Sequence, residues 1–208
     1  MAVVKAATVP GTRVKTRLAR SFFARSAELV APALLGKTLV VVSPSGARLA
    51  VRLVETEAYG PGDPASHAFR GPTARTEVMF GPAGHLYVYF VYGMHWCANV
   101  VTGASSEGSA VLLRAGEPLE GREEISIHRG GREPLATGPG RLAQALGLTG
   151  ADSGTDVVGG ARCWFEKGTA PRSDAVAAGP RVGVRQAADV PWRFWEIGNS
   201  FVSPPRAP

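Results

Sequence analysis

Residues 38–59 decide the predicted fold, and they read Thr-Leu-Val-Val-Val-Ser-Pro-Ser-Gly-Ala-Arg-Leu-Ala-Val-Arg-Leu-Val-Glu-Thr-Glu-Ala-Tyr. The first five of these residues are mostly β-branched, which favours a strand, and the Ser-Pro-Ser-Gly that follows is typical of a turn. After the turn, the alternation of a strand places Leu49, Val51 and Leu53 on one face. The stretch therefore predicts a β-hairpin whose second strand is long, from about residue 47 to residue 59.

Two glutamates continue the apolar row of this second strand. Strict alternation places Glu55, Glu57 and Tyr59 on the same face as the apolar side chains that precede them. A carboxylate in an apolar interior loses hydration, which makes it a useful general base, and hydrolysis at an acetal-like carbon needs such a group. The residues alone leave two interpretations open: at least one carboxylate is catalytic, or one forms a structural ion pair with an arginine such as Arg114.

The chain outside this hairpin favours short elements joined by turns. It has 26 glycines and 16 prolines in 208 residues, which argues against long helices and fits one domain, two at most. The spacing of apolar residues predicts a helix within residues 18–35. The other expected elements are helices at 122–128 and 141–146, a hairpin at 86–101, strands at 110–115, 181–184 and 192–195, a long loop at 60–84, and irregular chain at 149–175.

The hairpin at 86–101 is rich in aromatic residues. Alternation puts Tyr87 and Tyr89 on one face, and ordinary core packing explains several of the aromatic side chains. The expected tip is different, because Tyr92 and Met94 would leave large apolar groups in water. Such groups can wedge between stacked bases, and aromatic faces can bind an extruded base.

Basic residues are concentrated at the start of the chain. Residues 1–52 hold nine Lys or Arg and one Glu, and arginines outnumber lysines 19 to 4 in the whole chain. Arginine suits bidentate contact with phosphate, and basic segments attract nucleic acid. We expect residues 1–17 to form a flexible basic arm. A solvated basic surface without a partner is the alternative interpretation.

Several classes of protein are disfavoured. The two cysteines and four histidines show no ligand spacing, so neither a metal nor another cofactor is expected. Gly138-Pro139-Gly140-Arg141 only loosely matches a dinucleotide-binding loop, since no strand precedes it. No run of 18 apolar residues predicts a membrane span, and no secretory signal is evident. We therefore expect a cytoplasmic protein, associated with the nucleoid if the source is bacterial.

Taken in order, these motifs resemble the alkyladenine (3-methyladenine) DNA glycosylase family, the purine DNA glycosylases of base-excision repair. The resemblance covers about residues 18–203. The segments that carry it are Ala19-Arg20-Ser21-Phe22-Phe23, Leu34-Leu35-Gly36, Val54-Glu55-Thr56-Glu57-Ala58-Tyr59, Asp63-Pro64-Ala65-Ser66-His67, Val78-Met79-Phe80, Leu86-Tyr87-Val88-Tyr89 with Tyr92-Gly93-Met94, and Val111-Leu112-Leu113-Arg114-Ala115 with Glu117-Pro118-Leu119-Glu120-Gly121. The resemblance implies an α+β fold: one domain, residues 18–208, around a curved antiparallel sheet with a protruding β-hairpin and helices at the periphery.

The resemblance also implies an activity. Members of the family bind double-stranded DNA that contains a damaged purine, flip the purine into a pocket and hydrolyse its N-glycosidic bond, which leaves an abasic site. By position, Glu57 matches the carboxylate that deprotonates the attacking water, and Arg114 matches an arginine beside that water. The other matched residues are Tyr59, His67, Tyr89, Asn99 and Leu112 in the base pocket, Tyr92 as the residue that fills the gap in the duplex, and Met94, Thr73, Arg75 and Arg141 as DNA contacts.

The expected substrates are alkylated or deaminated purines such as 3-methyladenine, 7-methylguanine and hypoxanthine, and we expect a monomer. Two other functions remain open. The first is a hydrolase of free nucleosides or nucleotides, although a free nucleoside would need no wedge at Tyr92. The second is a module that binds lesions without excising them, in which Glu57 would have no required role.

Overall fold

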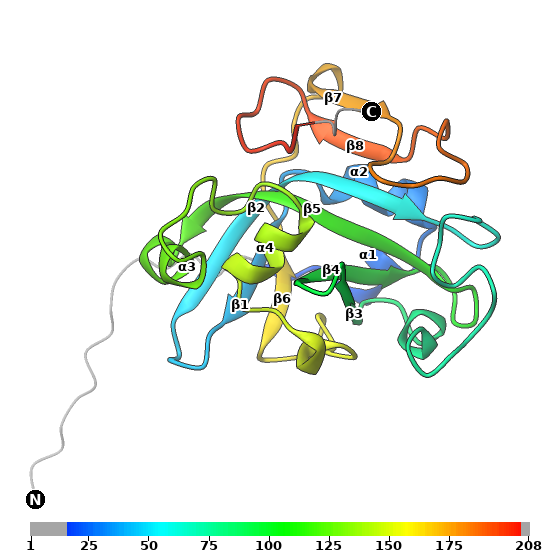
Figure 1. Ribbon diagram of the computed structural model, residues 1–208, viewed down its shortest axis with the longest axis horizontal. Helices are drawn as coiled ribbons and strands as arrows, with labels where there is room; N and C mark the ends of the chain where they lie inside the picture. Colours follow the sequence, from blue (N-terminus) through cyan, green and yellow to red (C-terminus); the bar gives the residue numbers. More distant parts are fainter. Residues whose placement is uncertain (1–15, 205–208) are drawn as a thin grey trace, which may run out of the picture.

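The predicted hairpin forms the centre of the sheet. Strand β1 (Thr38–Val42) pairs antiparallel with the first part of β2 (Arg48–Tyr59), and β2 pairs along its other edge with β5 (Ser109–Glu120). The computed structural model describes residues 16–204, which build an eight-stranded sheet in the order β3-β4-β5-β2-β1-β6, with β7 and β8 attached to β2 (Figure 1). This curled antiparallel sheet with few helices confirms the expected α+β class.

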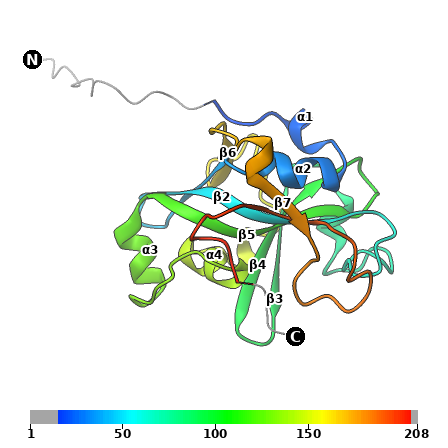
Figure 2. The same ribbon diagram turned by 90° about the horizontal axis from the view of Figure 1, so that it is seen from above.

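The remaining elements are short. The other strands are β3 (Leu86–Val91), β4 (His95–Thr102), β6 (Cys163–Glu166), β7 (Val176–Gly179) and β8 (Arg193–Glu196). The helices are α1 (Arg20–Phe23), α2 (Ala27–Leu34), α3 (Arg122–His128) and α4 (Pro139–Ala145), with 3-10 turns at Glu77–Phe80, Gly150–Asp152 and Ser173–Ala175. Figure 2 shows α1 and α2 on one side of the sheet and α3 and α4 on the other. No helix within residues 16–204 has the length and apolarity that a membrane crossing requires.

A register shift in β2 decides which way the two glutamates point. The pairing with β5 is interrupted on both sides of Glu55, so strict alternation does not continue through it. As a result Leu53 and Ala58, which alternation would separate, belong to the same core, and the Thr56 hydroxyl donates to the Ala31 carbonyl of α2 at 2.9 Å. The prediction that the glutamates extend the row of Leu53 is therefore wrong: Glu55 and Glu57 flank Thr56 in the strand and point away from α2, to which Thr56 points.

Other differences from the sequence prediction have local causes. The helix predicted within residues 18–35 is divided into α1 and α2. Where the chain leaves α1, the carbonyls of Phe23 and Arg25 both accept a hydrogen bond from the Gly103 amide. Residues 149–175 were expected to be irregular but contain β6, which pairs with β1. Residues 181–184 form a turn and no strand, since Gly183 has a φ of +77°.

The predicted arm lies mostly outside the described residues, which begin at Thr16. Its last two residues are attached to the sheet: the Thr16 carbonyl accepts a hydrogen bond from Lys167, and Arg17 forms a β-bridge with Glu166. The Arg17 guanidinium also lies 4.1 Å from the centre of the Trp164 ring. The folded chain thus includes at least the final part of the segment assigned to the arm.

Candidate active site

A pocket of about 510 Å³ opens on the side of the sheet to which the glutamates point. Its walls come from β2, the β3–β4 hairpin, β5, the segment between β2 and β3, and the segment that precedes β8. Seven of the residues selected from the sequence line it, namely Tyr59, His67, Tyr89, Tyr92, Asn99, Leu112 and Arg114. Residues that are up to 55 positions apart in the chain thus meet around one pocket.

Glu57 lies beneath the pocket wall and is fully buried. Its Oε2 accepts a hydrogen bond from the Tyr59 hydroxyl at 2.9 Å, and its Oε1 accepts one from the Val182 amide at 2.7 Å. Arg114 Nη1 lies 3.2 Å from the same Oε1. Burial and the adjacent carboxylate raise the pKa of Tyr59, so its hydroxyl stays protonated and remains a donor to Glu57.

Glu55 is held much more completely than Glu57. Its Oε1 accepts hydrogen bonds from Arg114 Nε at 2.7 Å, from Arg193 Nε at 2.8 Å and from the Ser203 hydroxyl at 2.8 Å. Its Oε2 accepts a hydrogen bond from the Ser203 amide at 2.8 Å. Burial alone would raise the pKa of Glu55, but Arg114 and Ser203 outweigh burial and hold the pKa below its usual range. Glu55 therefore fits the second interpretation of the sequence, a structural ion pair with Arg114. Arg114 also pairs with Glu57, so it bridges the two carboxylates.

Three aromatic rings form one wall of the pocket. Tyr87 and Tyr89 are stacked with ring centres 5.5 Å apart, and His67 meets Tyr89 edge-on at 4.5 Å. His67 Nδ1 and the Tyr87 hydroxyl are 3.1 Å apart. Burial and the nearby Arg75 lower the pKa of His67, which favours the neutral imidazole at physiological pH. The wall therefore offers uncharged aromatic surface to a planar ring.

Another part of the pocket lining comes from β4 and β5. Asn99 and Leu112 face each other across these strands, and Asn99 Nδ2 donates to the Tyr87 carbonyl at 3.0 Å, which fixes the side chain. Cys97 also lines the pocket, and burial raises the pKa of its thiol to about 11. The sequence analysis missed Cys97, although alternation along the strand would have placed it on the same face as Asn99.

The tip of the β3–β4 hairpin stands beside the pocket, and Figure 2 shows the hairpin projecting from the body. Tyr92 and Met94 at this tip are 66% and 68% exposed, which confirms the expected exposure of large apolar groups. Tyr92 has a φ of +53°, a left-handed conformation that costs a residue other than glycine roughly 1–2 kcal/mol. The fold thus holds a tyrosine at a strained and exposed position.

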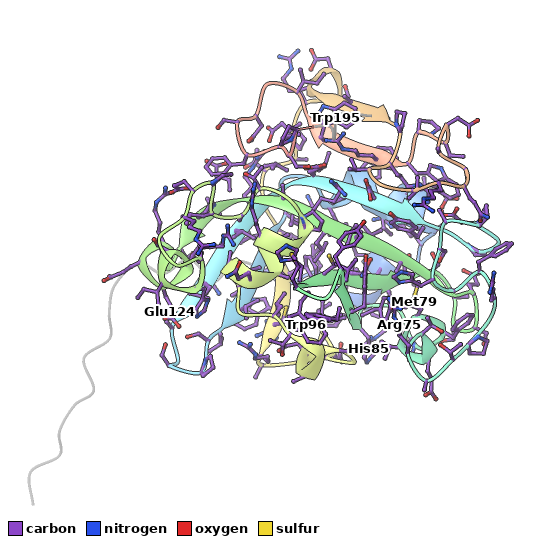
Figure 3. All side chains as sticks on the ribbon, in the orientation of Figure 1. Arg75, Met79, His85, Trp96, Glu124 and Trp195 are labelled. Carbon is purple, nitrogen blue, oxygen red and sulfur yellow. The ribbon has the colours of Figure 1, made fainter. Side chains whose placement is uncertain are left out.

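The other expected DNA contacts differ in their surroundings. Thr73 is bonded to the Thr76 hydroxyl at 2.9 Å, so it stabilises its own turn. The Arg75 guanidinium lies 5.5 Å from the centre of the Tyr89 ring, and Figure 3 labels it close to Met79 in the same segment. Arg141 is exposed on α4, whose first residues reach the hairpin and the pocket. Among residues 16–204 no group of three or more His, Cys, Asp or Glu could hold a metal ion.

An aromatic pocket, a buried carboxylate behind its wall and an exposed tyrosine in its lining are compatible with an enzyme that extrudes a base from nucleic acid. A family model described as Methylpurine-DNA glycosylase matches residues 21–200. The chain belongs to that family, and it is a DNA-repair enzyme of the DNA glycosylase class.

Relatives from distant bacteria support this assignment over nearly the whole chain. A protein of Burkholderia cenocepacia named "Putative 3-methyladenine DNA glycosylase" is 49% identical over 95% of this chain and 94% of its own length. Proteins of the same name are 50% identical in Streptomyces avermitilis, over 93% of each chain, and 45% identical in Carboxydothermus hydrogenoformans, over 89% of this chain and 98% of the relative.

Proposed function

We propose that this DNA glycosylase flips alkylated or deaminated purines, including 3-methyladenine, 7-methylguanine and hypoxanthine, out of duplex DNA and hydrolyses their N-glycosidic bond. The observation that carries the proposal is the contrast between the two buried glutamates. Glu55 accepts four hydrogen bonds, from Arg114, Arg193 and Ser203. Glu57 accepts two, from the Tyr59 hydroxyl and the Val182 amide, and both of these residues line the pocket. Glu57 therefore keeps acceptor capacity for a water molecule beside the pocket.

The reaction follows from this capacity. Glu57 takes a proton from water as the water oxygen bonds to the anomeric carbon, and the bond from that carbon to the purine nitrogen breaks with its electron pair on the base. A purine alkylated at N3 or N7 is cationic, so it accepts this electron pair without a proton from the enzyme. Arg114 Nη1, 3.2 Å from Glu57 Oε1, holds the carboxylate in place for this step.

Holding the extruded base is the task of the pocket. Tyr59, Tyr89 and His67 offer ring faces and edges for stacking, and a neutral His67 avoids repulsion of a cationic purine. Asn99, fixed by its bond to the Tyr87 carbonyl, occupies the place where the exocyclic amine of normal guanine would collide. Tyr92 at the exposed hairpin tip fills the gap that the flipped nucleotide leaves.

The test is release of base from a duplex with one hypoxanthine or one 7-methylguanine. Glu57→Gln should retain binding to the damaged duplex and lose base release by a factor of about 10² or more, the usual range for a positioned general base. Glu77→Gln is the matched control, because this substitution removes the same charge from an exposed side chain. Wild-type release by Glu57→Gln would contradict the proposal.

The same assay separates the two alternatives. A hydrolase of small molecules would release the base from a free nucleoside at a rate comparable to that on duplex DNA. A lesion-binding module would bind the damaged duplex and release nothing. Slow or absent release from the nucleoside, combined with release from the duplex, is the result that the exposed Tyr92 predicts.

A further inference from the structure

We propose that Arg181 is a positioning residue for base excision: it joins two segments that line the pocket and thereby holds the Val182 amide against Glu57. This inference rests on the proposed role of Glu57 and adds a residue that touches neither DNA nor the reacting atoms. Arg181 is buried, and the sequence analysis had placed it in a strand that does not form.

The first contact of Arg181 is a buried ion pair with Asp63. Both terminal nitrogens of the guanidinium reach the Asp63 carboxylate, with Nη2 at 3.0 Å from Oδ1, and the two side chains are 0% and 1% exposed. Asp63 in turn organises the segment that carries His67, since its Oδ1 accepts from the Ala65 amide and its carbonyl accepts from the Ser66 amide. The ion pair therefore fixes the wall that contains His67.

The same guanidinium is also fixed to the end of β2. Its Nη1 donates to the Ala58 carbonyl at 3.1 Å, and its carbon lies 4.7 Å from the centre of the Tyr59 ring. On the other side it lies 5.4 Å from the Trp192 ring and donates to the Ala187 carbonyl at 3.4 Å. One cation thus connects two regions that are far apart in the sequence, residues 58–63 and residues 181–192.

The residue after Arg181 transmits this arrangement to the catalytic carboxylate. Val182 donates its amide proton to Glu57 Oε1 at 2.7 Å, and Val182 to Gln186 line the pocket. If Arg181 were replaced, the turn would lose its attachment, and both the Glu57 orientation and this wall would shift. A misplacement of about 1 Å in a catalytic group can reduce a rate by about 10²-fold.

A purely stabilising role explains the contacts of Arg181 less well. A buried ion pair gives little net stability, because desolvation of the two charges offsets their attraction, and apolar residues often replace it without loss. The Nε of Arg181 is buried with no hydrogen-bond partner among residues 16–204, which adds to the cost. What the pair supplies is a defined geometry between two loops, at the point where both meet the active site.

The experiment measures single-turnover base release and its half-saturating enzyme concentration on a hypoxanthine duplex. Arg181→Met should lower the rate constant about 10- to 100-fold and change half-saturation by less than about threefold, because the geometry of Glu57 is lost while DNA contacts remain. Asp63→Asn should have an effect of the same kind, and Arg181→Lys, which keeps the charge, should recover part of the rate. Arg172→Met, which removes an arginine from an exposed ion pair with Asp174, should leave the rate unchanged.

A double-mutant cycle tests whether Arg181 acts through Glu57. In the Glu57→Gln background, Arg181→Met should cost less than about threefold, since the carboxylate that it positions is already gone. The inference would be overturned if Arg181→Met lowered the rate by the same factor in the Glu57→Gln background as in wild type. It would also be overturned if Arg181→Met alone kept a rate within about twofold of wild type. If Arg181→Met does not fold, a rate within about twofold of wild type for Asp63→Asn would overturn it instead. Failure of the proposed function is distinct, because it appears as wild-type release by Glu57→Gln itself.

Discussion

Replacement of Glu55 by glutamine is the sharpest test of how this site is built. The substitution keeps the size of the side chain and removes its charge. In the folded protein Glu55 Oε1 lies 2.7 Å from Arg114 Nε and 2.8 Å from Arg193 Nε, and the two arginine side chains are 5% and 7% exposed. The variant would therefore leave two buried guanidinium groups without their shared carboxylate.

The magnitude follows from what each arginine retains. Arg114 keeps an ion pair with Glu57 at 3.2 Å, whereas Arg193 keeps a hydrogen bond to the Ser203 carbonyl at 2.8 Å. Removal of one partner of a buried ion pair costs about 3–5 kcal/mol. For a protein of this size that corresponds to a fall of roughly 6–20 °C in the melting temperature.

The effect should depend on pH in a defined direction. Burial tends to raise the pKa of Glu55, but Arg114 and Ser203 lower it, so the folded-state pKa lies below the ordinary value of 4.5. A carboxyl group of this kind contributes its full stability above the unfolded-state pKa and loses it as the pH falls through the folded-state pKa. The difference in stability between wild type and Glu55→Gln should therefore narrow in acid.

Urea and thermal unfolding at neutral pH and in acid measure both quantities. Glu77→Gln, which removes an exposed charge, is the control and should change stability by less than about 0.5 kcal/mol. A loss below about 1 kcal/mol for Glu55→Gln would refute the ion-pair argument, since a buried pair cannot be that weakly coupled. A difference that widens in acid would refute the direction of the pKa shift.

Three further predictions concern activity. Tyr92→Ser should weaken binding and excision on duplex DNA by about 1–3 kcal/mol, the scale of one base–aromatic stack. Equal losses on duplex and single-stranded substrates would show that Tyr92 is no wedge. Asn99→Ser should raise excision of normal guanine relative to hypoxanthine by making room for the exocyclic amine, and an unchanged ratio would remove Asn99 from the specificity argument. Borohydride should trap no covalent protein–DNA adduct, because the lysines of the described residues, Lys37 and Lys167, do not line the pocket. EDTA should not inhibit; a trapped adduct, or inhibition that a divalent metal reverses, would contradict hydrolysis by Glu57-activated water.

Local sequence patterns determined the parts of the fold that depend on local rules. The alternation in residues 86–101 placed Tyr87 and Tyr89 on one face, and the structure puts both on the pocket wall. The hairpin at residues 38–59 was evident from its turn and its β-branched first strand, and it forms as β1 and β2. The exposed tip at Tyr92 followed from the position of the turn. In each case neighbouring residues contain the whole signal.

Only the tertiary structure decided what the two glutamates do. The register shift beside Glu55 turns both carboxylates away from the row that alternation assigns them, and pairing between β2 and β5 creates that shift. Glu55 is then closed by Arg193 and Ser203 from the end of the chain, while Glu57 stays beside the pocket. Local periodicity carries no information about such partners, because ion pairs and hydrogen bonds between distant segments depend on how the sheet curls. The sequence therefore identified the carboxylates, and long-range packing gave each of them its partners.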